Sequence, residues 1–352
     1  MNNLLRIAII IPRLEHLGPV KVMQALVNSL HENKDLYITV FYIEKRIVED
    51  LKIQVPVMRL IPRKFPFSDF DIIHTNGIRP DLFAFINRKK IKYHISTIHN
   101  FVFEDLSFTY NRLISLFFGN LWLCLWKKAD KLVCVSDNMC IYYQKWFSSS
   151  QLEVVHNGIS LQYEGDSPDG DIISIIENFK LRGLRILGTI GILTRRKGID
   201  QILLMMERNK ETALIIIGDG REIRNLQSLA KKLGITERCH FCGYRINAIN
   251  YMRYFDFFIM PSRSEGFSLT MLEAAKNKVR VICSDLDVFK EFLNPDEVTF
   301  FKLEDINSLS AAIKESVYTG IEKAELAYLR FKNEYTDGIM ASRYLELYKS
   351  AV

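Results

Sequence analysis

Short apolar runs that alternate with helix-like segments constrain the fold of this chain more than any other feature. Runs that are apolar on both faces are typical of parallel strands in a sheet covered by helices on both sides. They form two series, 6–11, 37–42, 71–74, 93–97 and 131–135, then 185–190, 212–217, 239–242, 257–260 and 280–283. We therefore predict an α/β chain with two doubly wound parallel sheets, which bind ligands beyond the carboxyl ends of their strands.

A polar segment separates the two series. Residues 160–171 are rich in Gly, Pro and Asp, a composition typical of linkers. A chain of 352 residues is long enough for two domains of ordinary size. We predict one domain over residues 1–165 and a second over residues 166–337.

The composition is that of a globular protein, with 48% hydrophobic and 25% charged residues. The net charge of +6 is modest, and the basic clusters at 88–92 and 127–128 leave two interpretations open. They are either solvated surface, or an attraction to anionic lipid or to a pyrophosphate-linked acceptor. Nothing in the pattern favours a nucleic-acid partner.

Two apolar segments resemble membrane signals. Residues 4–12 are followed by no small-residue cleavage site, so we predict a buried first strand rather than a signal peptide. Residues 113–126 are too few to span a bilayer. We predict a core helix there, with a helix on a membrane surface as the alternative.

The six cysteines, at 124, 134, 140, 239, 242 and 283, lie mostly in apolar surroundings. We therefore expect reduced thiols of an intracellular protein. Cys239 and Cys242 have the spacing of a metal-binding cysteine pair, but their odd separation on a strand places the two sulfurs on opposite faces. No second pair completes a tetrahedral set, so the sequence disfavours zinc.

Residues 264–274, with the sequence SEGFSLTMLEA, carry the strongest functional signal. They follow an apolar strand, so a buried strand ends in a turn that opens directly into a helix. That geometry aims free backbone N–H groups and the positive end of a helix dipole at one spot, an anion site. Glu265 and Glu273 flank the spot, and carboxylates suit uncharged hydroxyls of a ribose or a sugar. The combination predicts a nucleotide-sugar pocket.

The frame from Glu265 to Glu273 resembles the signature of retaining glycosyltransferases of family 4, which have the GT-B fold. The segments 154–159, 196–198, 217–220 and 241–243 agree with that family in the same order. The resemblance implies two Rossmann-like domains facing a central cleft, with residues 338–352 as a helix that returns to the acceptor-side first domain.

The resemblance also implies an activity. A hexosyltransferase of this family moves a sugar from a UDP- or GDP-sugar to a glycan or lipid-linked acceptor, with retention of configuration and without a metal or other cofactor. Surface polysaccharide or lipopolysaccharide synthesis is the usual setting, in the cytoplasm or in peripheral contact with the inner face of the membrane.

Individual residues take their expected roles from the same resemblance. Glu265 and His99 would contact the transferred sugar, Glu273 the ribose, and Lys197 the leaving diphosphate. Ile192 occupies the position of the family's usual arginine, and Arg196 or Arg195 would replace it. The remaining residues expected beside the donor are Gly18, Gly218, Tyr244, Gly266, Phe267, Ser268 and Leu269. His74, at the end of another strand, fits a site role and a structural role equally well.

Four other interpretations are weaker. Asp285 and Asp287 have the spacing of a metal-binding pair, but follow the helix that already serves the phosphate. The turn at 218–220 resembles half of a dinucleotide fingerprint and lacks a third glycine, so NAD binding is disfavoured. A glycan phosphorylase would need a pyridoxal-phosphate lysine motif, which is not evident. A catalytically silent transferase-like scaffold is the remaining alternative, for which Ile192 and Pro19 argue mildly.

Overall fold

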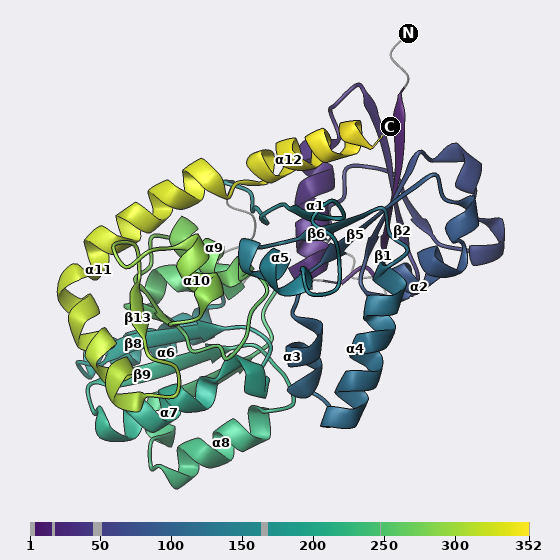
Figure 1. Cartoon of the computed structure of the whole chain (residues 1–352). Helices are drawn as coiled ribbons and strands as arrows, with labels where there is room; N and C mark the ends of the chain where they lie inside the picture. Colours follow the sequence, from purple (N-terminus) through teal and green to yellow (C-terminus); the bar gives the residue numbers. More distant parts are fainter. Residues whose placement is uncertain (1–3, 16–17, 45–50, 163–167, 247, 352) are drawn as a thin grey trace. The chain divides into compact units, whose positions relative to one another are not determined.

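The computed structural model describes residues 4–15, 18–44, 51–162, 168–246 and 248–351 (Figure 1). The chain divides into two compact units, residues 1–160 with 335–352 and residues 161–334. The boundary predicted between residues 165 and 166 lies outside the described residues.

Unit 1 is built on a seven-stranded parallel sheet with the order β3-β2-β1-β4-β5-β6-β7. Its strands are β1 (Leu5–Ile11), β2 (Leu36–Tyr42), β3 (Val57–Arg59), β4 (Ile72–Asn76), β5 (Tyr93–Ile98), β6 (Lys131–Cys134) and β7 (Leu152–Val154). Its helices are α1 (Gly18–Leu30), α2 (Ile78–Ile86), α3 (Val102–Ser107), α4 (Arg112–Trp126), α5 (Asp137–Tyr143) and α12 (Asp337–Ser350), with short 3₁₀ turns η1 (Pro62–Lys64), η2 (Phe67–Asp69) and η3 (Arg88–Lys90).

Unit 2 is built on a six-stranded parallel sheet with the order β10-β9-β8-β11-β12-β13. Its strands are β8 (Arg185–Ile190), β9 (Thr212–Ile217), β10 (Cys239–Gly243), β11 (Phe257–Met260), β12 (Val281–Ser284) and β13 (Thr299–Phe301). Its helices are α6 (Gly170–Leu181), α7 (Ile199–Arg208), α8 (Ile223–Lys232), α9 (Leu269–Lys276), α10 (Asp287–Phe292) and α11 (Ile306–Glu334), with 3₁₀ turns η4 (Arg195–Lys197), η5 (Thr236–Arg238) and η6 (Ala248–Tyr254). The prediction of two doubly wound parallel sheets is confirmed.

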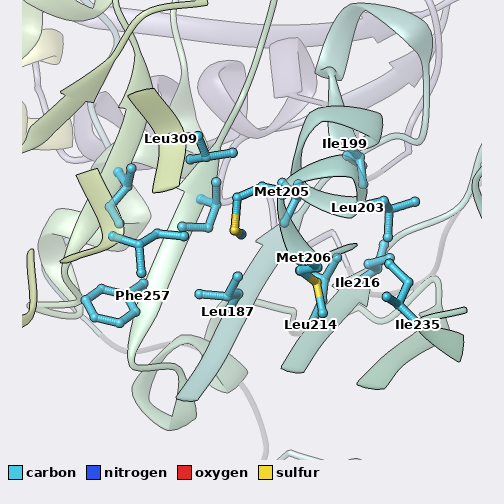
Figure 2. Packing of buried hydrophobic residues seen from close by; sticks show 14 of the residues in the cluster. Leu187, Ile199, Leu203, Met205, Met206, Leu214, Ile216, Ile235, Phe257 and Leu309 are labelled. Carbon is cyan, nitrogen blue, oxygen red and sulfur yellow. The ribbon is translucent and has the colours of Figure 1, made fainter. Parts of the chain in front are cut away.

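The core of unit 2 explains the continuous apolar runs. Every residue of β9 is buried, because helices cover both faces of the sheet. Figure 2 shows Leu187, Leu214 and Ile216 of the strands packed against Met205 and Met206 of α7. This packing fixes where each strand ends, and therefore where the loops that follow it begin.

Each sheet has one pair of neighbouring strands whose connections run to opposite sides. In unit 2 the pair is β8 and β11, because the chain leaves β8 towards β9 and leaves β11 towards β12. The loops after such a pair diverge and leave room for a ligand at the carboxyl edge of the sheet. The corresponding pair in unit 1 is β1 and β4.

The helix α12 packs on unit 1 through buried tyrosines. His74 bridges Tyr348, whose hydroxyl lies 2.7 Å from Nδ1, and Thr97, whose hydroxyl lies 2.7 Å from Nε2. Tyr344 reaches the same threonine at 3.0 Å. Burial lowers the pKa of His74 to about 3, so its ring is neutral at pH 7. His74 therefore serves the structure of unit 1.

The helix predicted for the core at 113–126 forms α4, and its last residues Leu123, Leu125 and Trp126 are buried as predicted, but the prediction is wrong for its earlier part. Its buried residues include Ser115 and Gly119, whereas Leu113 and Phe117 are exposed. A Cβ atom at Gly119 would lie 2.3 Å from the ring of Phe103 on α3, so only glycine permits this close approach. Apolar composition predicts burial only where neighbouring elements cover the helix.

A buried carboxylate anchors α2 and α4 to the sheet of unit 1. Asp81 is fully buried, and its Oδ1 accepts hydrogen bonds from the hydroxyls of Thr75 at 2.6 Å and Ser96 at 2.8 Å. Its Oδ2 accepts from the indole N–H groups of Trp122 at 3.0 Å and Trp126 at 2.9 Å. Burial raises the pKa of Asp81, because these neutral donors only partly offset the loss of water.

Replacing Asp81 tests this anchor. Asp81→Ala removes the acceptor of the Ser96 hydroxyl and of the indole N–H groups of Trp122 and Trp126, and we expect the free energy of unfolding to fall by about 3 kcal/mol or more. Asp69→Ala is the control, because Asp69 is exposed and accepts only from Ser68, and we expect a change within about 0.5 kcal/mol. Urea unfolding followed by circular dichroism measures both, and equal effects of the two substitutions would contradict the anchoring role.

Candidate functional site

A buried glutamate lies where unit 2 has its diverging loops. Glu265 stands between β11 and α9, and only 5% of it is exposed. The hydroxyl of Ser262, at the end of the same strand, donates to Glu265 Oε1 at 2.7 Å. A charged carboxylate at such depth requires cationic partners.

Two cations from the loop after β8 meet this carboxylate. Lys197 Nζ donates to Glu265 Oε1 at 2.6 Å, and Arg196 Nη1 donates to Oε2 at 3.0 Å. Arg196 Nη1 also donates to the backbone carbonyl of Ser264 at 2.7 Å. The partners are 68 and 69 residues apart in the sequence, and they meet because β8 and β11 are neighbours in the sheet.

The cations determine the charge state of Glu265. Burial alone would raise its pKa, but the charges of Lys197 and Arg196, with hydrogen bonds from Lys197 and Ser262, outweigh burial and lower the pKa to about 2. The carboxylate is therefore ionised at pH 7. Two cations against one carboxylate leave a positive excess close to the N-terminus of α9, an arrangement suited to an anion.

Glycines permit the close approach of the loops that form this cluster. Gly198 has a φ of +65°, and a Cβ there would lie 2.0 Å from the carbonyl oxygen of Pro261. Gly218 has a φ of +140°, and a Cβ there would lie 1.9 Å from the carbonyl oxygen of Gly191. Any larger residue at these two positions would separate the loops. Gly191, Lys197 and Ser262 line one small hollow.

Arg263 contacts the loop that carries Arg196 and is not among the residues predicted from the sequence. Its guanidinium donates to both carboxylate oxygens of Asp200, at 3.0 and 2.7 Å, and to the backbone carbonyl of Arg195 at 2.6 Å. Its backbone N–H donates to the carbonyl of Arg196 at 2.7 Å. Arg263 thus attaches the η4 loop to the β11 loop. The one feature of the sequence that could have indicated Arg263 is its position two residues before Glu265.

The structure distinguishes the two candidate arginines. Arg196 is in the cluster, whereas the side chain of Arg195 is exposed and its carbonyl is the group that Arg263 binds. Ile192, which follows Gly191, is exposed, as is Tyr244, which follows β10. Both residues lie at the carboxyl edge of the sheet, where Gly218 follows β9.

The segment from Gly266 to Leu269 leads from the cluster into α9. Ser268 precedes the helix and its side chain makes no capping hydrogen bond to it. Phe267 is buried against Phe292, with 4.1 Å between the ring centroids. Glu273 lies in the second turn of α9 and is partly exposed.

In unit 1 the predicted His99 follows β5 and contacts the end of β4. Its Nε2 lies 3.0 Å from Asn76 Oδ1, so Nε2 carries the proton. Burial of the ring lowers the pKa of His99 to about 4, so the ring is neutral at pH 7. The Nδ2 group of Asn76 is buried and has no acceptor among the described residues. Gly18 begins α1 and is exposed.

The aspartates of the alternative metal interpretation have separate partners. Asp285 Oδ1 accepts a hydrogen bond from the backbone N–H of Leu303 at 3.0 Å. Asp287 is largely exposed and lies 3.6 Å from Lys290 Nζ.

Comparison with known proteins shows which family the chain belongs to. Residues 174–326 match the model of glycosyl transferases group 1, and residues 23–163 match that of glycosyltransferase family 4. The O-antigen biosynthesis glycosyltransferase WclY of Escherichia coli is 32% identical over 359 residues, with 98% of each chain covered. The chain belongs to glycosyltransferase family 4. It is a transferase with the GT-B fold.

Solved structures agree with the fold of this transferase. HepE of Anabaena, in complex with UDP and glucose, has a TM-score of 0.81 at 15% identity, covering 98% of this chain and 100% of that one. WaaG, a glycosyltransferase involved in lipopolysaccharide biosynthesis, has a TM-score of 0.72 at 13% identity, covering 96% and 98%.

The ion cluster should leave a pH signature in the stability of the transferase. Because the unfolded chain takes up a proton near the ordinary pKa of 4.5 while folded Glu265 stays ionised down to about 2, its contribution is complete above pH 5 and is lost as the pH falls. We expect the stability advantage of the wild type over Glu265→Gln to shrink by about 2 kcal/mol between pH 6 and pH 3. Urea unfolding across that range measures it. An advantage that does not change with pH would contradict the pairing.

Proposed function

We propose that this chain transfers a hexose from a nucleoside diphosphate sugar to a glycan or lipid-linked acceptor, with retention of anomeric configuration. The observation that carries the proposal is the buried Glu265 carboxylate with Lys197 and Arg196, next to the N-terminus of α9. A fixed cationic excess beside free helix N–H groups fits the charge that a leaving diphosphate develops.

Each group of the cluster has a distinct part in the proposed reaction. Lys197 and Arg196 bind the diphosphate, with the backbone N–H groups of Gly266 to Leu269 at the helix N-terminus. Glu265 orients the two cations and stabilises the positive charge that develops at the anomeric carbon. Glu273 binds the ribose hydroxyls. No residue is assigned as a covalent nucleophile, since retention by attack from the face of the leaving group needs none.

Unit 1 supplies the proposed sugar and acceptor contacts. Asn76 has a buried N–H group without an acceptor among the described residues, and neutral His99 offers the lone pair of Nδ1. Both suit uncharged hydroxyls better than phosphate.

The relatives support the class of donor and acceptor. One is named UDP-Gal:alpha-D-GlcNAc-diphosphoundecaprenol alpha-1,3-galactosyltransferase and is 22% identical over 68% of this chain. That name supports a UDP-sugar donor and a lipid diphosphate acceptor, and the name of the O-antigen enzyme WclY supports a role in surface polysaccharide synthesis. We propose that the reaction takes place at the inner face of the membrane. We propose that no metal takes part, because Lys197, Arg196 and the helix N-terminus supply the positive charge.

A donor panel tests this function. We expect one UDP- or GDP-sugar to be hydrolysed or transferred in the presence of EDTA, with anomeric configuration retained in the product by NMR. Arg196→Ala should weaken nucleoside diphosphate binding at least about tenfold, since a hydrogen bond to a charged group is worth about 1.5–3 kcal/mol. The adjacent control, Arg195→Ala, should stay within about twofold, because that side chain is exposed. The proposal is overturned if none of the donors is turned over. Its metal-free mechanism is overturned if EDTA abolishes activity and Mg²⁺ restores it.

The two glutamates give a crossed comparison. Glu265→Gln removes a charge that matters most in the transition state, so we expect turnover to fall about a hundredfold or more. It should leave nucleoside diphosphate affinity equal or tighter, because the cations lose a competing anion. Glu273→Gln should do the reverse and weaken nucleoside diphosphate binding about tenfold. Calorimetry and initial rates measure both variants, and the assignment of roles is wrong if both glutamates affect binding alone.

A further inference from the structure

The exposed face of α4 is apolar, although α4 lies on the surface of unit 1 (Figure 1). Leu113, Phe117 and Leu121 recur every four residues and are 79%, 67% and 39% exposed. Ile114 and Phe118 lie beside them and are exposed as well. We call these five residues the apolar stripe. Helical spacing places all of them on one side of α4.

The opposite face of α4 makes the contacts with unit 1. It carries the small residues Ser115 and Gly119, which are buried, and Gly119 lies against Phe103 of α3. Trp122 and Trp126 attach the same helix to Asp81. A surface helix ordinarily buries its large apolar residues and exposes its polar ones. Between Leu113 and Leu121 this order is inverted, whereas Leu123, Leu125 and Trp126 nearer the end of α4 are buried in the ordinary way. Exposed apolar patches of this kind mark interaction surfaces.

The charges that α4 and its flanking residues carry are all of one sign, whereas the neighbouring α3 carries Glu104 and Asp105. Residues 106–129 contain no Asp or Glu, and their basic residues are Arg112, Lys127 and Lys128. These three are exposed and pair with no carboxylate in the part of the chain that the structure describes. The basic turn η3 is attached at the same end of α4, because Arg88 Nε donates to the carbonyl of Lys128 at 2.7 Å. A surface with an apolar centre and cationic ends complements an anionic lipid surface.

We propose that α4 docks this protein onto an anionic phospholipid bilayer, lying in the interfacial plane with its apolar stripe among the acyl chains. Arg112, Lys127 and Lys128 then lie at the level of the lipid phosphates. At 15 residues α4 is short of a membrane span, and no described helix is long and apolar enough to cross a bilayer. Docking of this kind deepens the proposed function, because it brings the transferase to the surface where a lipid-linked acceptor resides.

Vesicle binding without donor or acceptor tests the proposal. The full chain is floated with vesicles of phosphatidylglycerol and phosphatidylcholine in equal parts, and with phosphatidylcholine alone. We expect binding to the anionic vesicles that weakens as salt rises. The variant Leu113→Gln/Phe117→Gln/Leu121→Gln should bind at least about tenfold more weakly, and Lys127→Glu/Lys128→Glu at least about threefold more weakly.

The helix α11 of unit 2 provides a matched control. Tyr318, Ile321 and Leu329 are also exposed apolar residues on a helix, and replacing all three by Gln should leave vesicle binding unchanged. Circular dichroism and urea unfolding check that each variant is folded. Equal binding of the wild type and the stripe variant overturns the proposal. The proposal is also overturned if the wild type does not bind vesicles but sediments as a dimer, and the stripe variant sediments as a monomer. The apolar stripe would then be the contact with a second copy of the chain.

The two proposals can fail separately. Vesicle binding without turnover of any nucleotide sugar would remove the proposed function and leave the docking surface. Turnover without vesicle binding would do the reverse.

Discussion

Burial opposes ionisation of a carboxylate, and the cations that keep Glu265 ionised organise this part of unit 2. These cations are Lys197 and Arg196, which come from a loop that is distant in sequence. The pairing holds the β8 and β11 loops together at the point where their strands diverge. Gly198 permits the two loops to approach closely, and Arg263 attaches one loop to the other.

The same pairing prepares the site for an anion. Two cations side by side repel each other, and the carboxylate between them stabilises both in one arrangement before a ligand arrives. Because the positive charge exceeds the negative, a diphosphate would find fixed partners rather than mobile lysine and arginine side chains. Preorganisation of this kind is the general source of electrostatic catalysis.

The buried carboxylate of unit 1, Asp81, is stabilised by hydrogen bonds rather than by cations. Asp81 has four neutral donors and no cation, so its pKa is raised, whereas the pKa of Glu265 is lowered. The Asp81 network ties α4 to the sheet through Trp122 and Trp126. Polar contacts and the small residues Ser115 and Gly119 therefore hold the first part of the inner face of α4, and the large apolar side chains from Leu113 to Leu121 remain at the surface. The first arrangement is an ion cluster that joins two loops, and the second is a hydrogen-bonded anchor for a helix.

The sequence by itself determined the two parallel sheets, because short runs such as 212–217 are apolar on both faces and alternate with helix-like segments, the pattern of parallel strands covered by helices. It also determined that Glu265 follows a strand and begins the turn that opens into α9. It could not choose between Arg195 and Arg196, because neighbouring residues point in different directions and only the η4 turn decides which one meets the carboxylate. It gave no reason to select Arg263 or Ser262, whose partners are brought near by strand order. The inverted face of α4 was likewise decided by tertiary structure, because periodicity defines the two sides of a helix while the neighbouring elements determine which side is covered.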